Sequence, residues 1–344
     1  AERVIFEDNL DFSAIAPQTT VPLLSTSISP GLQMGQRSGD IVINGPGHAT
    51  IGGGFFPFFD TGTSPGLQVN TGETLGLIAP NIDLAGGVIQ TDGAHIQLRG
   101  VSEGLLTISD DQGAWRADST AVETFGDIQL SRQALVQSSG LSSGDIFLQG
   151  QTIRVRDGAL VLVQHSGPGA GGAIRINAPD RLTISGDARI APDQDILSLT
   201  IPGIAASTVT TETLGTGAAG DITVTSHRLQ ITDGGHLTTR SYGSGNTGNL
   251  ILDIAERIEL RGTSQLAPNL LGGLASGTFS TGNAGNIYVK TQNLSITDGS
   301  VLLASTAGSG RGGNVNIQVA EELILAGFEP TFESSSSLTS GTAG

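Results

Sequence analysis

A short phrase returns along this chain at regular spacings. It consists of Gly, a turn residue and then Ile-x-(Ile/Leu/Val), with one apolar substitution tolerated at the first Ile. Good copies begin at Gly144, Gly172, Gly220, Gly248, Gly285 and Gly313, and looser ones at Gly39 and Gly126. The steps between the good copies are 28, 48, 28, 37 and 28 residues, so short and long steps alternate. A recurring unit of this size indicates a fold built from stacked copies of itself.

Each good copy leads into further strands. A second alternating segment follows five to seven residues later, for example IRVRDG, LQITDG or LSITDG. On the short coils a third strand follows, such as ALVLVQ from Ala159 or SVLLAST from Ser300. Short strands with period-2 alternation, separated by turns and repeated, predict an all-β parallel β-helix, a solenoid with alternating short and long coils.

Composition agrees with this fold and excludes several function classes. The chain has 51 Gly among 344 residues, which disfavours long helices because Gly weakens a helix interior. The net charge is −16 and Lys290 is the single lysine, so nucleic acid is excluded as a partner for want of basic patches. Without Cys there are no disulfides or thiolate metal sites. The absence of a long apolar run predicts no membrane span.

Asp-Gly pairs close the second strand on every other coil. They are Asp157-Gly158, Asp233-Gly234 and Asp298-Gly299, whereas the intervening coils carry Ser185-Gly186, Arg261-Gly262 and Ala326-Gly327. Strands stacked about 4.8 Å apart place aspartates on alternate coils roughly 9.6 Å from one another, too far to share one cation. We therefore interpret these aspartates as turn residues rather than as a calcium ladder.

The alternation also predicts the inside of the shaft. We expect Ile222, Val224, Ile287, Val289, Val315 and Ile317 to be buried and stacked in register, with Arg154, Gln230 and Thr297 facing solvent. Asn249, Asn286 and Asn314 stand at equivalent turns. Two interpretations of them remain open: a ladder in which each amide hydrogen-bonds the next, or ordinary turn residues.

The long coils differ from the short ones by insertions at one place. We assign these to residues 191–218 and 267–283, and the tail from Phe328 has the same Pro, Ser, Thr and Gly character. Because they enter at the same point of alternate coils, they are expected to emerge on the same side. Such a row is either a binding face or a set of neutral surface loops, and the second is favoured.

Two local clusters raise the question of a site. FFPFFD, from Phe55 through Phe59 to Asp60, is either an exposed adhesive tip or an aromatic clamp packed on the shaft, and the clamp is favoured. SDDQGAWRAD contains Asp110, Asp111, Trp115, Arg116 and Asp118, which would suit a sugar-cleaving site, but a polar loop predicts the same letters. We therefore expect no enzyme activity, and no catalytic, cofactor-binding or metal-binding residue is assigned.

Histidine does not change that conclusion. His95 and His236 each follow an Asp-Gly-x turn, in the slot that Leu160 and Val301 hold elsewhere, and are expected to face solvent. His48, His165 and His227 have no partner identifiable from the sequence. No hydrolase, zinc-protease or phosphate-loop motif is present.

The phrases GNAGNI, LSITDG and ASTAGSGRGGNVNI, with the alternating coils, resemble the cyanobacterial filamentous-haemagglutinin-like exoproteins of two-partner secretion. The stretches from Phe12 and from Leu67 resemble the region that follows the secretion domain in those proteins. The resemblance implies a right-handed β-helix at the surface of, or outside, a Gram-negative-type cell. It implies export through an outer-membrane transporter partner, and a non-catalytic shaft of an adhesin or filament.

The resemblance sets further expectations. Three kinds of partner stay open: a surface glycan, a cell receptor and, through end-to-end association, a second copy of the chain. A structural surface-layer or matrix element stays open as an alternative function. A polysaccharide-acting enzyme is a further alternative, and it is the less favoured one. We expect residues 1–125 to be irregular first coils after a secretion domain that this sequence lacks. Residues 126–344 are expected to be regular repeats that continue beyond Gly344, where the next coil would begin.

Overall fold

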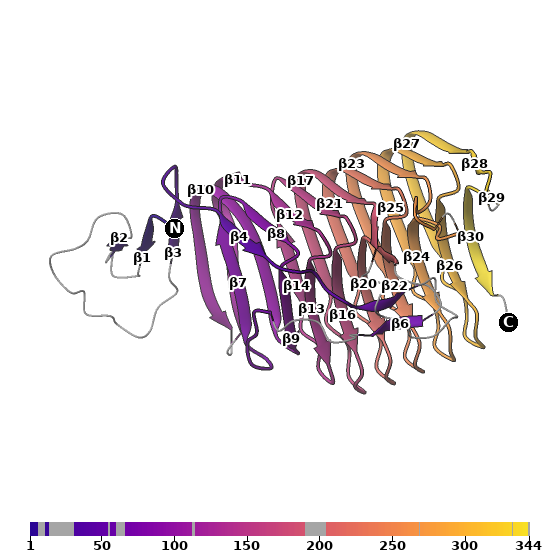
Figure 1. Ribbon diagram of the computed structural model, residues 1–344, viewed down its shortest axis with the longest axis horizontal. Coiled ribbons are helices and arrows are strands. Elements are labelled where there is room, and N and C mark those ends of the chain that lie inside the picture. The colour runs from indigo at the N-terminus through magenta and orange to yellow at the C-terminus, as the bar shows by residue number, and fades with distance from the viewer. Residues whose placement is uncertain are drawn as a thin grey trace.

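The computed structural model describes residues 1–5, 11–13, 31–53, 56–59, 66–111, 114–189, 204–267, 269–331 and 333–342. Over these residues the secondary structure is β-strand, with no helix. Figure 1 shows the strands stacked side by side along one axis, from β10 near one end to β27 and β30 at the other, with β6 lying across the middle of the stack. The predicted stack of parallel coils is confirmed. No helix in the described part is long and apolar enough to cross a membrane.

Two long sheets form the shaft. The larger has sixteen strands: β1 (Arg3–Ile5), β2 (Asp11–Ser13), β3 (Gly31–Met34), β4 (Ile41–Asn44), β7 (Thr74–Ala79), β8 (Ile82–Ala85), β10 (His95–Asp111), β11 (Ala114–Phe125), β12 (Ile128–Ser131), β14 (Ile146–Gln149), β15 (Thr152–Arg156), β17 (Ile174–Ser185), β21 (Ile222–Thr232), β23 (Leu250–Arg261), β25 (Ile287–Thr297) and β27 (Val315–Ala326). Most of its pairings are parallel, but β1, β2, β3 and β11 pair antiparallel at the N-terminal end.

The second sheet has eight parallel strands, which we call the third-strand sheet. They are β9 (Val88–Asp92), β13 (Leu135–Gly140), β16 (Leu160–His165), β20 (Thr208–Thr213), β22 (His236–Ser241), β24 (Gly273–Thr278), β26 (Val301–Thr306) and β30 (Ser337–Thr342). Three two-stranded pairs lie outside both sheets: β5 (Ile51–Gly53) with β6 (Phe56–Phe59), β18 (Asp187–Arg189) with β19 (Ile204–Ala206), and β28 (Phe328–Glu329) with β29 (Ser334–Ser335).

The core is a continuous column of aliphatic side chains. Ile222, Val224, Ile287 and Val289 are fully or almost fully buried and in register with one another through β23, which confirms their prediction. Val315 and Ile317 of β27 keep the register, but the prediction of their burial is wrong: they are only partly buried, because β27 pairs with β25 alone. The outward positions Arg154, Gln230 and Thr297 are half-buried rather than open, and two of them bond to neighbouring coils: Arg154 to Asp127 at 3.0 Å and Gln230 to Glu259 at 3.1 Å.

The Asp-Gly turns have the conformation of turn residues. Asp157, Asp233 and Asp298 have φ values of 56°, 52° and 56°, and the glycine after each is also at positive φ. Asp tolerates the left-handed region and Gly adopts it without steric cost. Intervening coils use one left-handed glycine, such as Gly186 or Gly262, before a longer connection. This geometry supports the interpretation of these aspartates as turn residues.

The asparagine positions form a ladder. The Oδ1 of Asn249 accepts the backbone N–H of Asn286 at 2.9 Å, and the Oδ1 of Asn286 accepts that of Asn314 at 2.9 Å. Asp221 begins this run, because its Oδ1 accepts the N–H of Asn249 at 2.7 Å. Each side chain therefore satisfies a backbone donor of the next coil, at a corner where the strand ladder is interrupted. Of the two interpretations left open, the ladder is correct, although each Asn side chain bonds to the backbone N–H of the next Asn and not to its side-chain amide.

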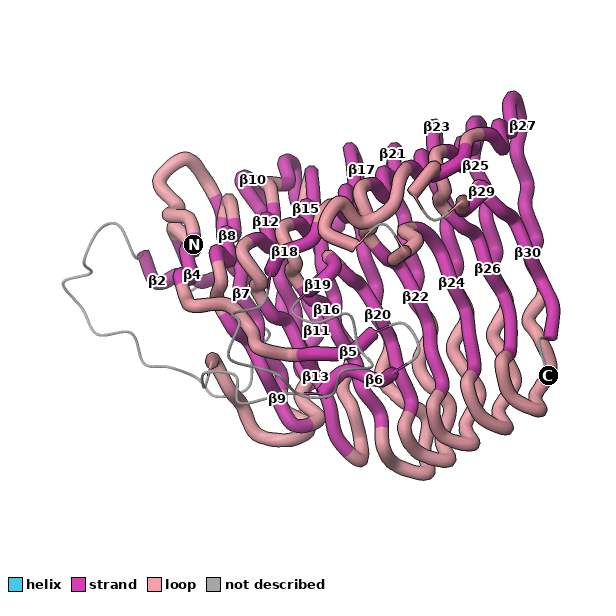
Figure 2. The backbone as a smooth tube through the Cα atoms, turned by 45° about the vertical axis from the view of Figure 1, so that its right-hand side comes forward, coloured by secondary structure: helices cyan, strands magenta, loops and turns pink. Residues whose placement is uncertain are grey.

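The insertions leave the shaft at one corner, as predicted, but their bounds were wrong. The third strands β20 and β24 lie inside the segments we had assigned to insertions, so every regular coil has a third strand. The inserted residues occupy only the connection between the second and third strands. Ser264 of one insertion donates a hydrogen bond to Asp187 at the start of the other. Figure 2 shows these loops along one edge of the shaft; residues 190–203 and Pro268 lie outside the described part.

Candidate functional site

The best-defined polar site lies on the outer face of the third-strand sheet, beneath the hairpin of β5 and β6. Alternation directs Leu135, Leu160 and Leu162 away from the shaft core, yet each has 1% exposure or less. They form a separate apolar cluster with Val88 and Phe58, and Phe58 comes from β6. Figures 1 and 2 show the hairpin lying across this sheet. The hairpin therefore covers outward-facing leucines that would otherwise contact water.

Hydrogen bonds fix the hairpin to three successive coils. Gln164 of β16 donates from Nε2 to the carbonyl of Phe58 at 2.8 Å. Glu212 of β20 accepts the N–H of Phe58 on Oε2 at 3.2 Å. Tyr242, directly after β22, donates from its hydroxyl to the carbonyl of Phe56 at 2.9 Å. The backbone of β6 is thus bonded by side chains and not by a strand of either large sheet.

A buried ion pair lies under the hairpin. Glu212 is fully buried, and its Oε1 lies 3.6 Å from Nη1 of Arg240, whose side chain is 7% exposed. The Arg240 guanidinium also lies over the Phe58 ring, 5.9 Å from its centroid. Burial raises the pKa of Glu212, and the attraction of Arg240 and the hydrogen bonds to the carboxylate offset this only in part. Burying such a pair removes two charges from water, a cost that their attraction and the hydrogen bonds to the carboxylate must offset.

The FFPFFD segment was predicted to be either an aromatic clamp or an exposed tip, and its residues differ in this respect. Phe58 packs on the shaft, as the clamp interpretation predicted. Phe56 and Phe59 are 44% and 50% exposed. Phe55 and Asp60 lie outside the described residues. Near the exposed rings, Tyr242 and Phe279 of consecutive coils stack with centroids 5.0 Å apart.

The two histidines of the predicted solvent-facing slot occupy different places. His236 does align with Leu160 and Val301 on the outer face, but it is half-buried, and its Nδ1 lies 2.7 Å from the carbonyl of Gly234. His95 instead begins β10 in the larger sheet, so its assignment to that slot was wrong. Its Nδ1 accepts the N–H of Asp145 at 3.1 Å, the role that aspartate and asparagine oxygens have at other coils.

The remaining histidines have partners that only the fold supplies. His48 is buried, and its Nε2 lies 3.0 Å from the carbonyl of Gly158. His165 is buried with Nδ1 3.4 Å from the hydroxyl of Ser143. His227 is half-exposed and lies 3.1 Å from Glu256. None of these contacts was visible in the sequence, because each joins residues 22 or more positions apart.

Among the described side chains of the SDDQGAWRAD cluster, Trp115 lies on the opposite face of β11 from Arg116 and Asp118. Trp115 packs over Gly76, where a Cβ would lie 2.1 Å from the ring, and its Nε1 donates to the carbonyl of Thr74 at 3.2 Å. Arg116 and Asp118 are exposed, on the other face of β11. Asp118 accepts hydrogen bonds from the Thr120 hydroxyl and, at 2.9 Å, from the Thr120 backbone N–H; these two bonds, the hydroxyl bond first, lower the pKa of Asp118. The side chains of Asp110 and Asp111 lie outside the described part.

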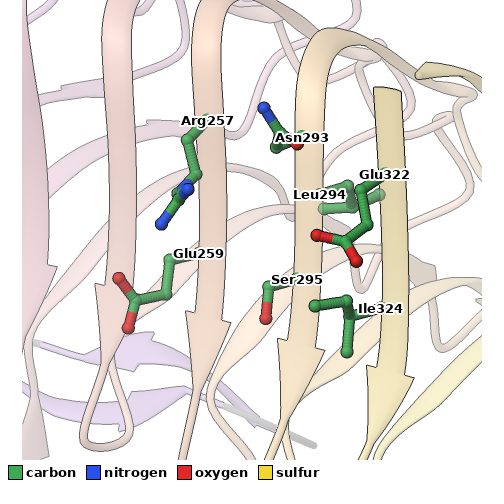
Figure 3. Close-up of a pocket in the computed structure, with 7 residues that line it drawn as sticks. All are labelled: Arg257, Glu259, Asn293, Leu294, Ser295, Glu322 and Ile324. Carbon is green, nitrogen blue, oxygen red and sulfur yellow. The ribbon is translucent and has the colours of Figure 1, made fainter. Parts of the chain in front are cut away.

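A surface depression lies over the second halves of β23, β25 and β27. It is lined by Arg257, Glu259, Asn293, Leu294, Ser295, Glu322 and Ile324 (Figure 3). Two of its polar groups are engaged with neighbours: Glu259 pairs with Arg261 at 3.2 Å, and Asn293 donates to Glu321 at 3.1 Å. Across the described residues, no group of three or more His, Asp or Glu side chains is placed to hold a metal ion.

Comparison with known protein families gave a match to the N-terminal part of the chain. Residues 1–148 match the family model of the TPS secretion domain, which supports an exoprotein of two-partner secretion. No curated protein and no solved structure matches the chain. Our expectation that the secretion domain is missing from this sequence is therefore wrong. The repeat phrase is weakest over these residues, where antiparallel strands and the β5–β6 hairpin interrupt the coils, so the repeat pattern did not reveal the domain.

Proposed function

We propose that this chain, whose first 148 residues match the secretion domain of two-partner exoproteins, is the non-catalytic shaft of a surface adhesin or filament. The match is the observation that carries the proposal. It implies an outer-membrane transporter as the export partner and a final place outside the cell or on its surface. The continuous stack of coils supports a rod that holds a binding region away from its anchor.

Export through a transporter partner is tested by a secretion assay. The chain, placed behind a periplasmic export signal, is produced with and without an outer-membrane transporter of the two-partner type from the same organism. We expect release into the medium only when the transporter is present. A chain that begins at residue 149 should stay in the periplasm. Equal release of the two forms would show that residues 1–148 do not direct export.

Adhesion is tested separately with the purified intact chain on glycan arrays and on cells. Binding that disappears on heat unfolding supports an adhesin. Absence of binding to every surface, with export intact, favours the alternative of a structural surface-layer or matrix element. The outer face of the larger sheet supports this alternative, because some of its polar side chains bond to the neighbouring coil, as Gln230 does to Glu259 at 3.1 Å and Lys290 to Asp253 at 3.2 Å.

A polysaccharide-acting enzyme is the weaker alternative. The orientation of Trp115 toward β7, with Arg116 and Asp118 on the opposite face, separates residues that such a site would bring together. Replacement of Asp110 and Asp111 by Asn, followed by polysaccharide cleavage assays, tests it. Cleavage by the wild type that the double variant lacks would establish an enzyme and contradict the non-catalytic shaft.

A further inference from the structure

The β5–β6 hairpin belongs to the segment that matches the secretion domain, but most of its contacts come from later coils. Leu135 is within residues 1–148, whereas Leu160, Gln164, Glu212 and Tyr242 follow the matched segment. The Phe58 to Glu212 bond joins residues 154 positions apart, and the Phe56 to Tyr242 bond joins residues 186 apart. The complete docking face therefore exists only once β16, β20 and β22 have joined the stack.

The hairpin has little stability of its own. β5 and β6 form an isolated antiparallel pair with a register irregularity between Ile51 and Gly53. A two-stranded hairpin in water is marginal without a surface to pack on. Its stability comes from Phe58 over the leucine cluster and from the three side-chain bonds to its backbone. Breaking these contacts leaves both large sheets fully paired.

We propose that the two strands of this hairpin, Ile51–Gly53 and Phe56–Phe59, form a clasp that closes on the outer face of the third-strand sheet only after the coils through β22 have formed, and that opens while the shaft stays folded. Opening uncovers Leu135, Leu160 and Leu162 together with the Glu212–Arg240 pair. Closure ties the first third of the chain to coils that follow it. This inference concerns the folding of the chain and does not depend on the proposed function.

The clasp can be tested with single thiols, because the chain has no Cys. Leu162 faces the clasp, and its neighbour Val163 faces the shaft core; each is 1% exposed. A Leu162→Cys thiol should react with a thiol reagent when the clasp opens. A Val163→Cys thiol should react only when the shaft unfolds. In the full-length chain we expect the first to react faster than the second, and equal rates would overturn the proposal.

A second comparison tests whether Phe58 holds the clasp closed. Phe58→Ala removes the ring that packs on the leucines, whereas Phe59→Ala removes a half-exposed ring from the adjacent position of the same strand. We expect Phe58→Ala to raise the Leu162→Cys reaction rate roughly tenfold or more, with the Val163→Cys thiol still protected. Phe59→Ala should leave both rates near wild type. Equal effects of the two variants would contradict the clasp.

If Phe58→Ala exposes the Val163→Cys thiol, the shaft itself has unfolded. Gln164→Ala then replaces it, because that change removes only the side-chain donor to the Phe58 carbonyl. Raised reactivity of Leu162→Cys alone supports the clasp, and unchanged reactivity overturns it.

The order of closure is tested by pulsed thiol labelling during refolding of the full chain. Leu237 lies in β22 on the core side and is fully buried. We expect a Leu237→Cys thiol to become protected before, or together with, a Leu162→Cys thiol. Protection of Leu162→Cys first would show that the clasp closes without β22, and this would overturn the proposed order.

Discussion

Single residues at the corners of the coils join each coil to the next. Asp221, Asn249 and Asn286 each accept a backbone N–H of the following coil through a side-chain oxygen. His95 does the same through Nδ1, so the position requires an acceptor of suitable reach rather than one residue type. An unpaired N–H at a partly buried corner would carry the cost of lost solvation, which explains why polar residues recur there.

The first prediction concerns this ladder. Asn286→Ala removes the acceptor for the Asn314 N–H and should lower the free energy of unfolding by about 1 kcal/mol. Asn286→Asp keeps an acceptor oxygen and should lose less. Urea denaturation monitored by circular dichroism measures both. Equal losses would mean that the acceptor is not the stabilising feature.

The second prediction concerns the core. Ile287→Asp places a carboxylate in the aliphatic column, where the side chain is fully buried, and should lower the free energy of unfolding by about 3–5 kcal/mol. Tyr288→Asp is the control, because Tyr288 is 42% exposed on the outer face of the same strand. Denaturant midpoints of the two variants should differ clearly, and similar midpoints would contradict the assigned faces.

The third prediction is a pH dependence from His236. Burial, with a smaller contribution from the charge of Arg240, lowers the pKa of His236 from 6.5 to about 3. Protonation therefore favours the unfolded chain, so this contribution to stability is complete above pH 6.5 and decreases as the pH falls toward 3. His236→Val introduces the residue that β26 has at the equivalent position, Val301. Between pH 7 and pH 5, the free energy of unfolding of this variant, measured by denaturant titration, should fall less than that of the wild type.

Glu212 acts in the opposite direction in the same titration. Its raised pKa makes its contribution to stability complete below its unfolded value of 4.5 and smaller as the pH rises above that value. Both chains retain Glu212, so the difference between them reports His236. Identical losses in wild type and His236→Val would refute the assignment.

At the scale of elements, connections of different length join the second strand of a coil to its third strand, and they occupy equivalent places. The short connection is Asp298-Gly299-Ser300 between β25 and β26, and the long one runs from Gly262 to Gly272 between β23 and β24. Both join strands that keep the same register with their neighbours. The strands therefore do not depend on the length of the loop that joins them.

The fourth prediction follows from this equivalence. Replacing residues 262–272 by Asp-Gly-Ser should leave the shaft folded and change the free energy of unfolding by no more than about 1–2 kcal/mol, chiefly through the lost Ser264 and Leu266 bonds to Asp187. Replacement by Ala-Ala-Ala, which disfavours left-handed φ, should cost more. Circular dichroism and urea denaturation measure both. Unfolding of the Asp-Gly-Ser variant would show that the loop is structural.

At the scale of the molecule, the shaft is a one-dimensional stack with one continuous core. The core runs from Ala79 to Ala304, and each regular coil pairs with the coils beside it. Stability in such a stack is close to a sum of coil and nearest-neighbour contributions. The clasp is an exception, because it joins the first part of the chain to coils well beyond its neighbours.

The fifth prediction tests this one-dimensional behaviour. In hydrogen-exchange mass spectrometry, Ile287→Asp should remove protection from β25 and the strands next to it, and leave β12 and β15 protected. Ile153→Asp should do the reverse, since Ile153 is fully buried in β15. Uniform loss of protection along the chain in either variant would mean that the shaft unfolds as one unit.

The repeats themselves were sufficient to predict the coil architecture, the inward rows around Ile287 and the corner from which the insertions emerge. These features depend on contacts between equivalent positions, and the residues that make each such contact recur in every coil. Even there, β20 and β24 were missed, because Thr-rich and Gly-rich strands resemble loop sequence. The last expected coil start, at Gly344, lies outside the described residues.

Only the tertiary structure determined the place of Phe58, the burial of Glu212 with Arg240 and the role of His95. Their partners lie 154, 28 and 50 residues away. No repeat relates Phe58 to Glu212. His95 and Asp145 do precede residues that are in register with each other, but His95 differs in residue type from the Asp and Asn that mark this position in other coils. Periodicity predicts that Leu160 and Leu162 face outward, but it does not show that another segment covers them. Residues far apart in sequence meet through packing of the whole shaft, and local sequence does not encode that packing.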